Sequence, residues 1–230
     1  MKPKKTDFQH VEELSRELSR DKITRERFSL EIPHKDACNA IYAAWKAVVE
    51  KRGGTFDLSD QTREQIRQTA EWLTDPHGKP SLLLCGLCGN GKTSLALGLK
   101  WLIEYVIEKE LGFTNRKEVD YSTAKGIAET RSMSSSTDPS LIRFSNAEML
   151  IVDDLGEEPK EVMVFGMIHT PIIDLMTARY SSQRLTIFTS NLNTDEIKAK
   201  YGERVYDRLR ESCDIVLFTN DSYRGRKQKQ

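Results

Sequence analysis

The chain has 230 residues, and its 35 lysine and arginine residues balance its 35 aspartate and glutamate residues. This length suits one α/β domain with an appendage better than two independent domains. The balanced charge excludes a general electrostatic attraction for nucleic acid, so any DNA contact must come from a local patch. No apolar run approaches the roughly 18 residues of a membrane span, and the amino terminus lacks the apolar segment of a signal peptide. We therefore expect a cytoplasmic protein with no membrane partner.

Three amphipathic helices are predicted ahead of the first core strand. The first covers residues 8–18, and the second begins near Asp36 and ends before Gly53. The third follows Ser59 and ends at the Asp75-Pro76 pair. One amphipathic stripe does not say what covers it, so these helices fit either packing on the following domain or binding of a partner protein.

Residues 81–94, SLLLCGLCGNGKTS, combine an apolar strand, a glycine-rich turn and the start of a helix. They match G-x-x-x-x-G-K-[ST] at every fixed position, which predicts a loop whose backbone N–H groups surround phosphates. Lys92 would reach the β and γ phosphates of ATP, and the Thr93 hydroxyl would bind Mg²⁺. The nucleotide-binding residues are predicted to be Gly86, Leu87, Cys88, Gly89, Asn90, Gly91, Lys92, Thr93 and Ser94.

Cys85 and Cys88 form a C-x-x-C pair inside the same stretch. A redox or zinc function there would compete with the nucleotide for the same backbone. His34 and Cys38 lie one helical turn apart, but no second pair accompanies them. We therefore favour nucleotide binding over either metal or redox chemistry.

The segment after the phosphate loop is predicted to continue the alternation of strands and helices. A helix carries Leu95, Leu99 and Val106 on one stripe, and residues 119–124 form a short strand that leads into a helix near Ile127. Residues 131–140, RSMSSSTDPS, have the composition of a polar surface loop, which fits either plain solvent exposure or a DNA contact.

Residues 149–156, MLIVDDLG, form a second apolar strand that ends in two carboxylates. Carboxylates at the end of a buried parallel strand are unfavourable unless a cation or water meets them. Together with the phosphate loop they predict a Walker B motif, in which Asp153 holds Mg²⁺ and Asp154 orients or deprotonates the attacking water. Glu157 and Glu158 are an alternative source of the base, although exposed loop acids explain them as well.

A helix with Ile168, Ile172 and Leu175 on its apolar face comes next, and Pro171 either begins it or bends it. Residues 185–191, LTIFTSN, then form a strand whose end should lie beside the phosphate loop in a parallel sheet. Asn191 is therefore placed to bind the γ phosphate or the water, although it also suits a turn.

The last part of the chain concentrates arginines. Asn193 begins a short helix, and GERVYDRLRESC brings Arg204, Arg208 and Arg210 into one stretch. These arginines fit either ion pairs on a solvated helix or a contact with the phosphate of a neighbouring subunit. A final strand at residues 215–218 precedes DSYRGR.

With these motifs in order, residues 56–226 resemble the AAA+ ATPases of the bacterial helicase-loader group, the DnaC and DnaI type, with the related IstB transposition helpers. The resemblance rests on GLCGNGKTS, LIVDDLG, Arg179-Tyr180 before TIFTSNL, GERVYDRLRE and DSYRGR. It implies a P-loop NTPase fold with a parallel sheet flanked by helices and no full carboxyl-terminal lid. It also implies that Asn191 is sensor 1, that Arg204 is an arginine finger and that Arg224 is sensor 2.

The resemblance implies an ATPase domain at residues 56–230 and a helical extension at 1–55 as a possible partner-binding region. The implied partners are a DnaB-type replicative helicase, single-stranded DNA and further copies of the chain, which share a site between subunits. Two alternatives stay open, namely an IstB-like helper that serves a transposase and a nucleotide-gated adaptor with little turnover. Asp154 stands where many AAA+ enzymes have glutamate, which implies slow hydrolysis.

Overall fold

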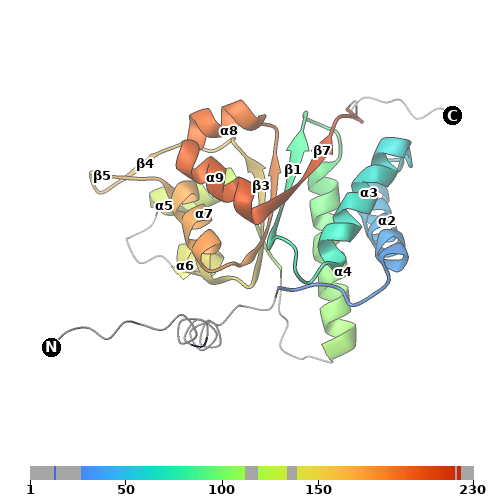
Figure 1. Ribbon diagram of the computed structural model, residues 1–230. Helices are drawn as coiled ribbons and strands as arrows, with labels where there is room; N and C mark the ends of the chain where they lie inside the picture. Colours follow the sequence, from blue (N-terminus) through green and yellow to red (C-terminus); the bar gives the residue numbers. More distant parts are fainter. Residues whose placement is uncertain (1–12, 14–26, 112–118, 134–138, 221, 224–230) are drawn as a thin grey trace.

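A five-stranded parallel sheet forms the centre of the molecule, with strand order β2-β3-β6-β1-β7 (Figure 1). The computed structural model describes residues 13, 27–111, 119–133, 139–220 and 222–223. The strands are β1 (Ser81–Gly86), β2 (Asp120–Thr123), β3 (Met149–Leu155), β6 (Leu185–Ser190) and β7 (Cys213–Phe218). This architecture is the predicted α/β P-loop fold, because each parallel connection passes through a helix.

Helices cover both faces of the sheet, and a separate two-stranded hairpin projects from one side (Figure 1). One layer consists of α2 (His34–Lys51), α3 (Asp60–Thr74) and α4 (Lys92–Leu111). The other consists of α5 (Ala124–Met133), α6 (Pro139–Asn146), α7 (Pro171–Ser181), α8 (Thr194–Tyr201) and α9 (Glu203–Ser212). The hairpin is made of β4 (Val162–Val164) and β5 (Met167–His169). None of the helices within the described ranges is long and apolar enough to cross a membrane.

Alternation along β1 divides the core into two apolar layers. Leu82 and Leu84 pack toward α2, α3 and α4, whereas Leu83 packs toward α5, α7 and α9. Successive side chains of a strand point to opposite faces, so a central strand covered on both sides is apolar throughout. This is why the sequence before the glycine-rich turn reads as a continuous apolar run.

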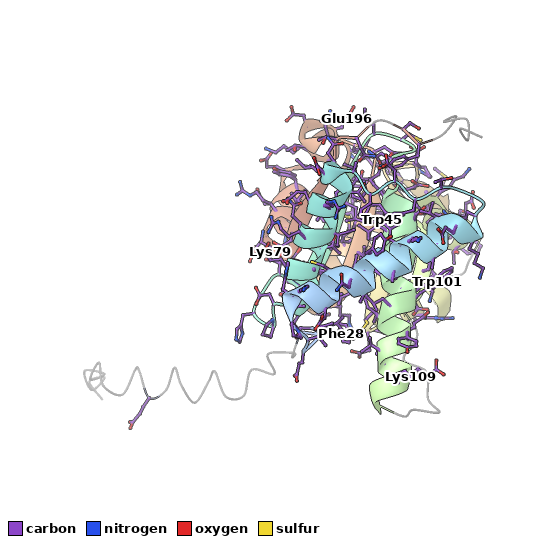
Figure 2. The ribbon with its side chains drawn as sticks, turned by 90° about the vertical axis from the view of Figure 1, so that its right-hand side faces the viewer. Phe28, Trp45, Lys79, Trp101, Lys109 and Glu196 are labelled. Carbon is purple, nitrogen blue, oxygen red and sulfur yellow. The ribbon has the colours of Figure 1, made fainter. Side chains whose placement is uncertain are left out.

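Helix α2 packs into the same core as the sheet (Figure 2). Trp45 is almost fully buried, and its ring makes edge contacts with Phe56 at 5.4 Å and with Phe218 at 6.0 Å. Gly98 of α4 allows this approach, because a Cβ atom there would lie 3.0 Å from the Trp45 backbone. Helices α2 and α3 thus pack on the sheet, while the division of the chain at residue 55 stays a prediction.

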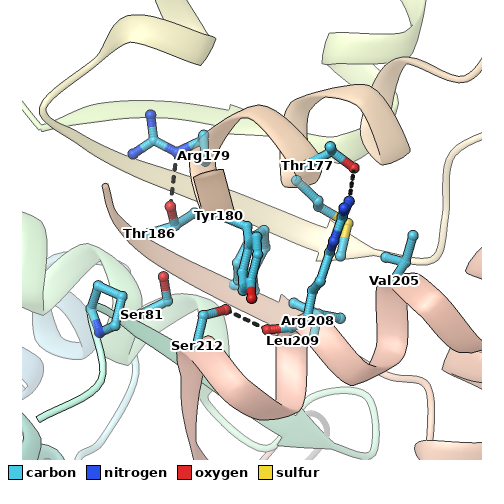
Figure 3. Close-up of a pocket in the computed structure, with 12 residues that line it drawn as sticks. Ser81, Thr177, Arg179, Tyr180, Thr186, Val205, Arg208, Leu209 and Ser212 are labelled. Atoms are coloured by element: carbon cyan, nitrogen blue, oxygen red, sulfur yellow. Dashed lines mark hydrogen bonds between the residues drawn. The ribbon is translucent and has the colours of Figure 1, made fainter. Parts of the chain in front are cut away.

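A buried arginine fixes the start of β6 (Figure 3). Arg179 is 2% exposed and donates to the Thr186 hydroxyl at 2.8 Å and to the carbonyl oxygens of Phe144, Ala147 and Leu185 at 2.7–2.8 Å. These bonds join α6, α7 and β6. A guanidinium is suited to this role because it carries five donors in a rigid plane.

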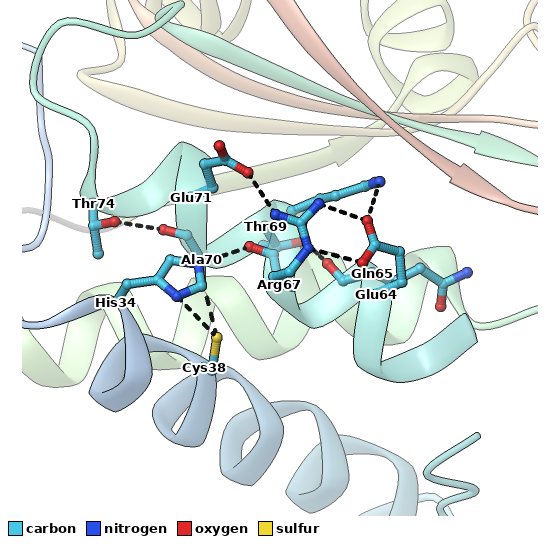
Figure 4. Close-up of polar contacts among 10 residues, drawn as sticks. His34, Cys38, Glu64, Gln65, Arg67, Thr69, Ala70, Glu71 and Thr74 are labelled. Atoms are coloured by element: carbon cyan, nitrogen blue, oxygen red, sulfur yellow. Dashed lines mark hydrogen bonds and ion pairs between the residues drawn. The ribbon is translucent and has the colours of Figure 1, made fainter. Parts of the chain in front are cut away.

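Helices α2 and α3 contact one another beside the His34 and Cys38 pair (Figure 4). The His34 ring donates to the carbonyl of Arg67 at 3.2 Å, and the Cys38 sulfur lies 3.8 Å from the same ring. Across the part of the chain that the structure describes, no group of three or more His, Cys, Asp or Glu residues could hold a metal ion. The contact is therefore one between two helices.

Several local predictions are confirmed. The Ser59 hydroxyl caps α3 by accepting from the Thr62 N–H, Pro171 stands in the first turn of α7, and Asn193 and Glu196 form a capping box on α8. The predicted first helix at residues 8–18 lies outside the described residues except for Glu13, which is helical.

Two local predictions are wrong. Residues 131–133 end α5 and residues 139–140 begin α6, so the predicted polar loop is shorter at both ends. Ile168 belongs to β5, not to the helix that follows. A strand of three residues is too short to show a period of two, so the sequence pattern does not separate Ile168 from the helix that follows.

We predict that Arg179→Met lowers the free energy of unfolding by about 3 kcal/mol or more, because it leaves one buried and two partly buried carbonyl oxygens without this donor. Urea denaturation followed by circular dichroism measures this change. Arg210→Met is the control, since Arg210 is exposed on α9, and it should shift stability by less than about 0.5 kcal/mol. Equal effects of the two substitutions would contradict a structural role for Arg179.

Candidate nucleotide-binding site

Three parallel strands end at one edge of the sheet and bring the predicted site residues together. In the ladder between β1 and β6, Cys85 stands opposite Ser190, and in the ladder between β3 and β6, Leu155 stands opposite Ser190. The phosphate loop follows β1, the Asp153-Asp154 pair closes β3, and Asn191 follows β6. Adjacent carboxyl ends of parallel strands are where α/β folds bind ligands.

A cavity of about 820 Å³ opens at this edge. Its size is that of a pocket for a small organic ligand. One wall is the phosphate loop and the other is the segment between α2 and α3. The lining residues are Trp45, Val49, residues 52–57, Thr62, residues 88–94, Asp154, Asn191 and Tyr223.

Lys92 is buried at the base of the loop, where its ammonium group contacts oxygens of that loop. It donates to the carbonyls of Gly86 and Leu87 at 2.7 Å each and to the Asn90 side-chain oxygen at 3.1 Å. Burial lowers its pKa from the usual value of a lysine. Carbonyl oxygens carry only partial charges, so an anion in the cavity would compete well for this ammonium group.

Asp153 is held by hydroxyl groups from three elements. Its Oδ1 accepts from Thr93 at 3.0 Å and from Thr189 at 2.5 Å, and its Oδ2 accepts from Tyr121 at 2.7 Å. Burial, followed by the bond to Asp153, raises the pKa of the Tyr121 phenol. A carboxylate and a threonine hydroxyl in contact are hard oxygen ligands, and this donor set fits Mg²⁺.

Asp154 lines the cavity on an irregular part of β3. The register between β3 and β6 shifts between Val152 and Leu155, and Asp154 has a φ of 54°. Its N–H donates to the Thr189 hydroxyl at 2.9 Å. The bulge turns Asp154 out of the alternation of the strand and toward the cavity, so the two carboxylates have different surroundings.

Polar contacts fasten the phosphate loop to the strand beyond it. The Asn90 amide donates to the Phe218 carbonyl at 2.8 Å, and the Asn220 amide donates to the Asn90 carbonyl at 3.1 Å. Gln65 of α3 donates to the Asn220 side-chain oxygen at 3.1 Å, and the Tyr223 N–H donates to the Gly89 carbonyl at 2.9 Å. The loop is thus held in shape by groups from both sides of it in the sequence.

The predicted arginines are placed differently from one another. Arg204 is exposed in the first turn of α9, away from the cavity, and within the described ranges it makes no hydrogen bond or ion pair. Arg208 donates to the Thr177 hydroxyl at 2.9 Å (Figure 3), and Arg210 lies 3.9 Å from Asp207. Arg224 lies outside the described residues.

The expectation that Glu158 is an exposed loop acid is wrong, whereas a role of Glu157 or Glu158 as the base stays a prediction. Glu158 is 3% exposed, and its carboxylate accepts from the Tyr201 hydroxyl at 2.5 Å and from the Gly156 N–H at 2.9 Å. Lys200 lies 3.6 Å from the same carboxylate. Glu158 therefore joins the end of β3 to α8, and Asp154 is the carboxylate of this segment that lines the cavity.

The chain is similar in sequence to replicative helicase loaders. Over 97 residues the chain is 35% identical to the replicative helicase loader DnaC of Escherichia coli K12 and, to the same extent, to that of Shigella flexneri. The match covers 42% of this chain and 38% of those proteins, so it spans well under half of the curated relatives. No family model matches the chain.

Solved structures share the fold. A crystal structure of the DnaC helicase loader superposes with a TM-score of 0.57 at 20% identity, covering 76% of this chain and 98% of that one. This chain has the same fold as that structure. A crystal structure of DnaI superposes with a TM-score of 0.52 at 20% identity, covering 74% of this chain and 88% of that one. The structure of AMPPCP-bound DnaA from Aquifex aeolicus superposes with a TM-score of 0.52 at 18% identity, covering 72% of this chain and 49% of that one. The predicted resemblance to the DnaC and DnaI type is confirmed.

Sequence reasoning missed Tyr121, Thr189 and the wall formed by residues 52–57. Thr189 carried one usable signal, because it is a hydroxyl residue inside an apolar strand that neighbours the Asp-Asp strand. Tyr121 carried none, since an aromatic residue in a short strand is usually explained by packing. The wall depends on how α2 and α3 pack, which the sequence pattern does not give.

We predict that Cys88 reacts with a thiol reagent at pH 8 and that Cys85 and Cys213 do not. Burial raises the pKa of Cys85 to about 11 and that of Cys213 to about 12, so both stay protonated until the pH approaches those values, while Cys88 is exposed. An ATP analogue should protect Cys88. Mass spectrometry of alkylated peptides measures the labelling, with exposure by denaturant as the control. Unchanged labelling of Cys88 with saturating analogue would contradict its place in the site.

We predict that Thr189→Val lowers ATP hydrolysis about 10- to 100-fold, because it removes the hydroxyl that holds both Asp153 and the Asp154 backbone. Thr189→Ser keeps the hydroxyl and is the matched control, which should retain most of the activity. Phosphate release under saturating ATP measures both variants. Loss of activity in the serine variant to the same extent would mean that packing, rather than the hydroxyl, is what matters.

Proposed function

We propose that this protein binds ATP with Mg²⁺ and hydrolyses it slowly. The observation that carries the proposal is that Lys92, Thr93 and Asp154 line one cavity large enough for a nucleotide, with Asp153 bonded to Thr93 at its wall. The similarity to a solved structure of DnaA with AMPPCP bound supports the choice of an adenine nucleotide.

In this proposal Lys92 exchanges its loop carbonyls for phosphate oxygens, and the N–H groups of the loop bind the same phosphates. Thr93 and Asp153 would hold Mg²⁺, which supplies neutralisation of phosphate charge when bound. Asp154 accepts a hydrogen bond from the attacking water and takes its proton. Asn191 lines the same cavity and fixes the position of the water or of the γ phosphate.

Slow turnover follows from the length of Asp154. Aspartate is one methylene shorter than glutamate, so its carboxylate stands farther from the water that it must orient. A switch that changes state once per nucleotide suits this geometry better than a motor. An adaptor with little turnover is the limiting case, and measured hydrolysis distinguishes the two.

We infer that the site is completed by a second copy of the chain. Arg204 is exposed, makes no bond within the described ranges and lies away from its own cavity. It is therefore free to reach the nucleotide of an adjacent subunit, as its place in the GERVYDRLRE motif implies. Arg224 follows Tyr223, whose N–H contacts the phosphate loop, and we propose that it acts on the nucleotide of its own subunit.

The client that we propose is a DnaB-type replicative helicase, which the assembled protein would hold on single-stranded DNA and release upon hydrolysis. The 35% identity to a protein named as a replicative helicase loader supports this choice over a transposase. Affinity purification from its own cells with an ATP analogue tests it. Recovery of a helicase is expected, and recovery of a transposase would favour the IstB-like alternative.

We predict that Lys92→Ala removes ATP binding, because the phosphates lose a buried cation that contacts their loop. Equilibrium titration with a fluorescent ATP analogue measures the affinity. Lys125→Ala is the control, since Lys125 is an exposed lysine of α5. An unchanged dissociation constant for Lys92→Ala would show that the loop does not bind phosphate.

We predict that Arg204→Ala binds ATP normally but loses hydrolysis by about 10³-fold or more. Mixing it with Asp154→Ala should restore some activity, because a shared site then receives one intact half from each variant. Arg210→Ala, on the same helix, is the control and should hydrolyse ATP like the unmodified protein. Absence of any restoration would argue that Arg204 does not act across subunits.

A further inference from the structure

The β4–β5 hairpin presents apolar side chains to solvent. Met163 pairs with Ile168 across the two strands, and Phe165 and Gly166 form the turn with φ values of 50° and 78°. Two positive φ values mark a turn that matches the twist of a hairpin. Phenylalanine seldom adopts such a φ, so the turn places an unusual residue at the tip of the hairpin.

One side of the hairpin is packed, but the other is open. Val162 and Val164 contact Ala128 of α5. Phe165 is 84% exposed and Met163 is 69% exposed, and Met167 and Ile168 are also mostly exposed. Scattered exposed apolar residues need no explanation, whereas four of them on one short projecting element mark a contact surface.

The hairpin belongs to the same side of the molecule as Arg204. The segment that leads into it is held to α8 by the Glu158 contact with Tyr201 and by Lys200, which donates to the carbonyls of Gly156 and Glu158 at 2.5 and 2.6 Å. Helix α9 begins at Glu203, directly after that point. These bonds fix the base of the hairpin relative to the helix that carries the exposed arginine.

A second exposed apolar group lies across the sheet. Figure 1 places the hairpin and the layer of α2, α3 and α4 on opposite sides of the sheet. On α4, Tyr105 is 59% exposed and Trp101 is partly exposed, and the two are four residues apart in the helix. Figure 2 shows where Trp101 lies on α4. Lys51 lies over the Trp101 ring at 4.9 Å, next to Arg52 at the cavity wall.

The charges around the two groups are complementary. Glu157 and Glu161 are exposed on the segment before β4, with Lys160 between them, so this approach has a net negative charge. Lys51 and Lys109 lie beside the aromatic pair on α4, where Glu108 is an exposed residue of opposite charge. Single-stranded DNA would need basic groups beside the aromatic tip, whereas Glu157 and Glu161 precede the hairpin and Arg131 lies at its other end, 3.1 Å from the His169 ring. A protein surface with basic flanks is therefore the better occupant.

We propose that the β4–β5 hairpin docks on the α4 face of a second copy of this chain, with Phe165 against Trp101 and Tyr105. This inference rests on the proposed sharing of the ATP site between subunits. Such a contact is head-to-tail, because the two surfaces differ and lie on opposite sides, and it repeats from subunit to subunit. Docking would bring the face that carries Arg204 toward the side of the neighbour that holds its nucleotide cavity.

Cross-linking from the tip of the hairpin tests the proposal. The full chain carrying photoreactive benzoylphenylalanine in place of Phe165 is irradiated with an ATP analogue and Mg²⁺, in the presence of helicase and single-stranded DNA. Cross-linked peptides are identified by mass spectrometry, with isotope-labelled and unlabelled chains mixed so that contacts between copies are recognised. The control carries the same group at Ile142, which is exposed on α6.

The expected result is an analogue-dependent cross-link between copies to the peptide that contains Trp101 and Tyr105, and no such product from position 142. A cross-link mainly to the helicase, to DNA or to another part of the second copy would overturn the proposal. So would the absence of any analogue-dependent product.

A second measurement separates failure of this inference from failure of the proposed function. Phe165→Ser should bind the fluorescent analogue as tightly as the unmodified protein yet assemble at least tenfold less well in sedimentation velocity, whereas Ile142→Ser should assemble normally. If Phe165→Ser binds and assembles normally, the docking proposal fails while the ATP site stands. If the unmodified protein does not bind the analogue, the proposed function fails first.

Discussion

The structure depends on one buried carboxylate whose oxygens are held by hydroxyl groups from three elements. Asp153 is 2% exposed, and it ties β3 to the first turn of α4, to β6 and to β2. An ionised carboxylate at such a place is costly unless donors or a cation meet it. Its hydroxyl partners satisfy it, and they fix the distance between the phosphate loop and the strand that carries Asp154.

The parts of the fold that follow from apolar periodicity and turn chemistry could be predicted from the sequence. The strand, glycine-rich loop and helix around Lys92 are specified within one short stretch, and so is the Asp-Asp strand end. The hairpin at residues 162–169 and the burial of Glu158 could not be found in this way. Each depends on contacts between segments far apart in the sequence, which no local pattern records.

The backbone conformations with positive φ outside glycine could not be predicted from the sequence either. Among the described residues other than glycine, Asp154, Phe165 and Gln183 have positive φ values. Each such residue costs roughly 1–2 kcal/mol, and the rest of the fold must compensate. Asp154 lines the nucleotide cavity, and Phe165 is the tip of the exposed hairpin. Strain of this kind gathers where a side chain must be held in a particular direction.

The bonds between the phosphate loop and residues 220–223 have a thermodynamic consequence. The Tyr223 N–H donates to the Gly89 carbonyl, and the Asn220 amide donates to the Asn90 carbonyl. The conformation of the loop is therefore coupled to the positions of Asn220 and Tyr223. Thermodynamic linkage is reciprocal. A ligand that binds one arrangement more tightly raises the affinity of other ligands that prefer that arrangement, and it lowers the affinity of ligands that prefer the alternative. A partner that pulls residues 220–223 away from the loop must therefore weaken nucleotide binding by the same factor that nucleotide weakens the partner.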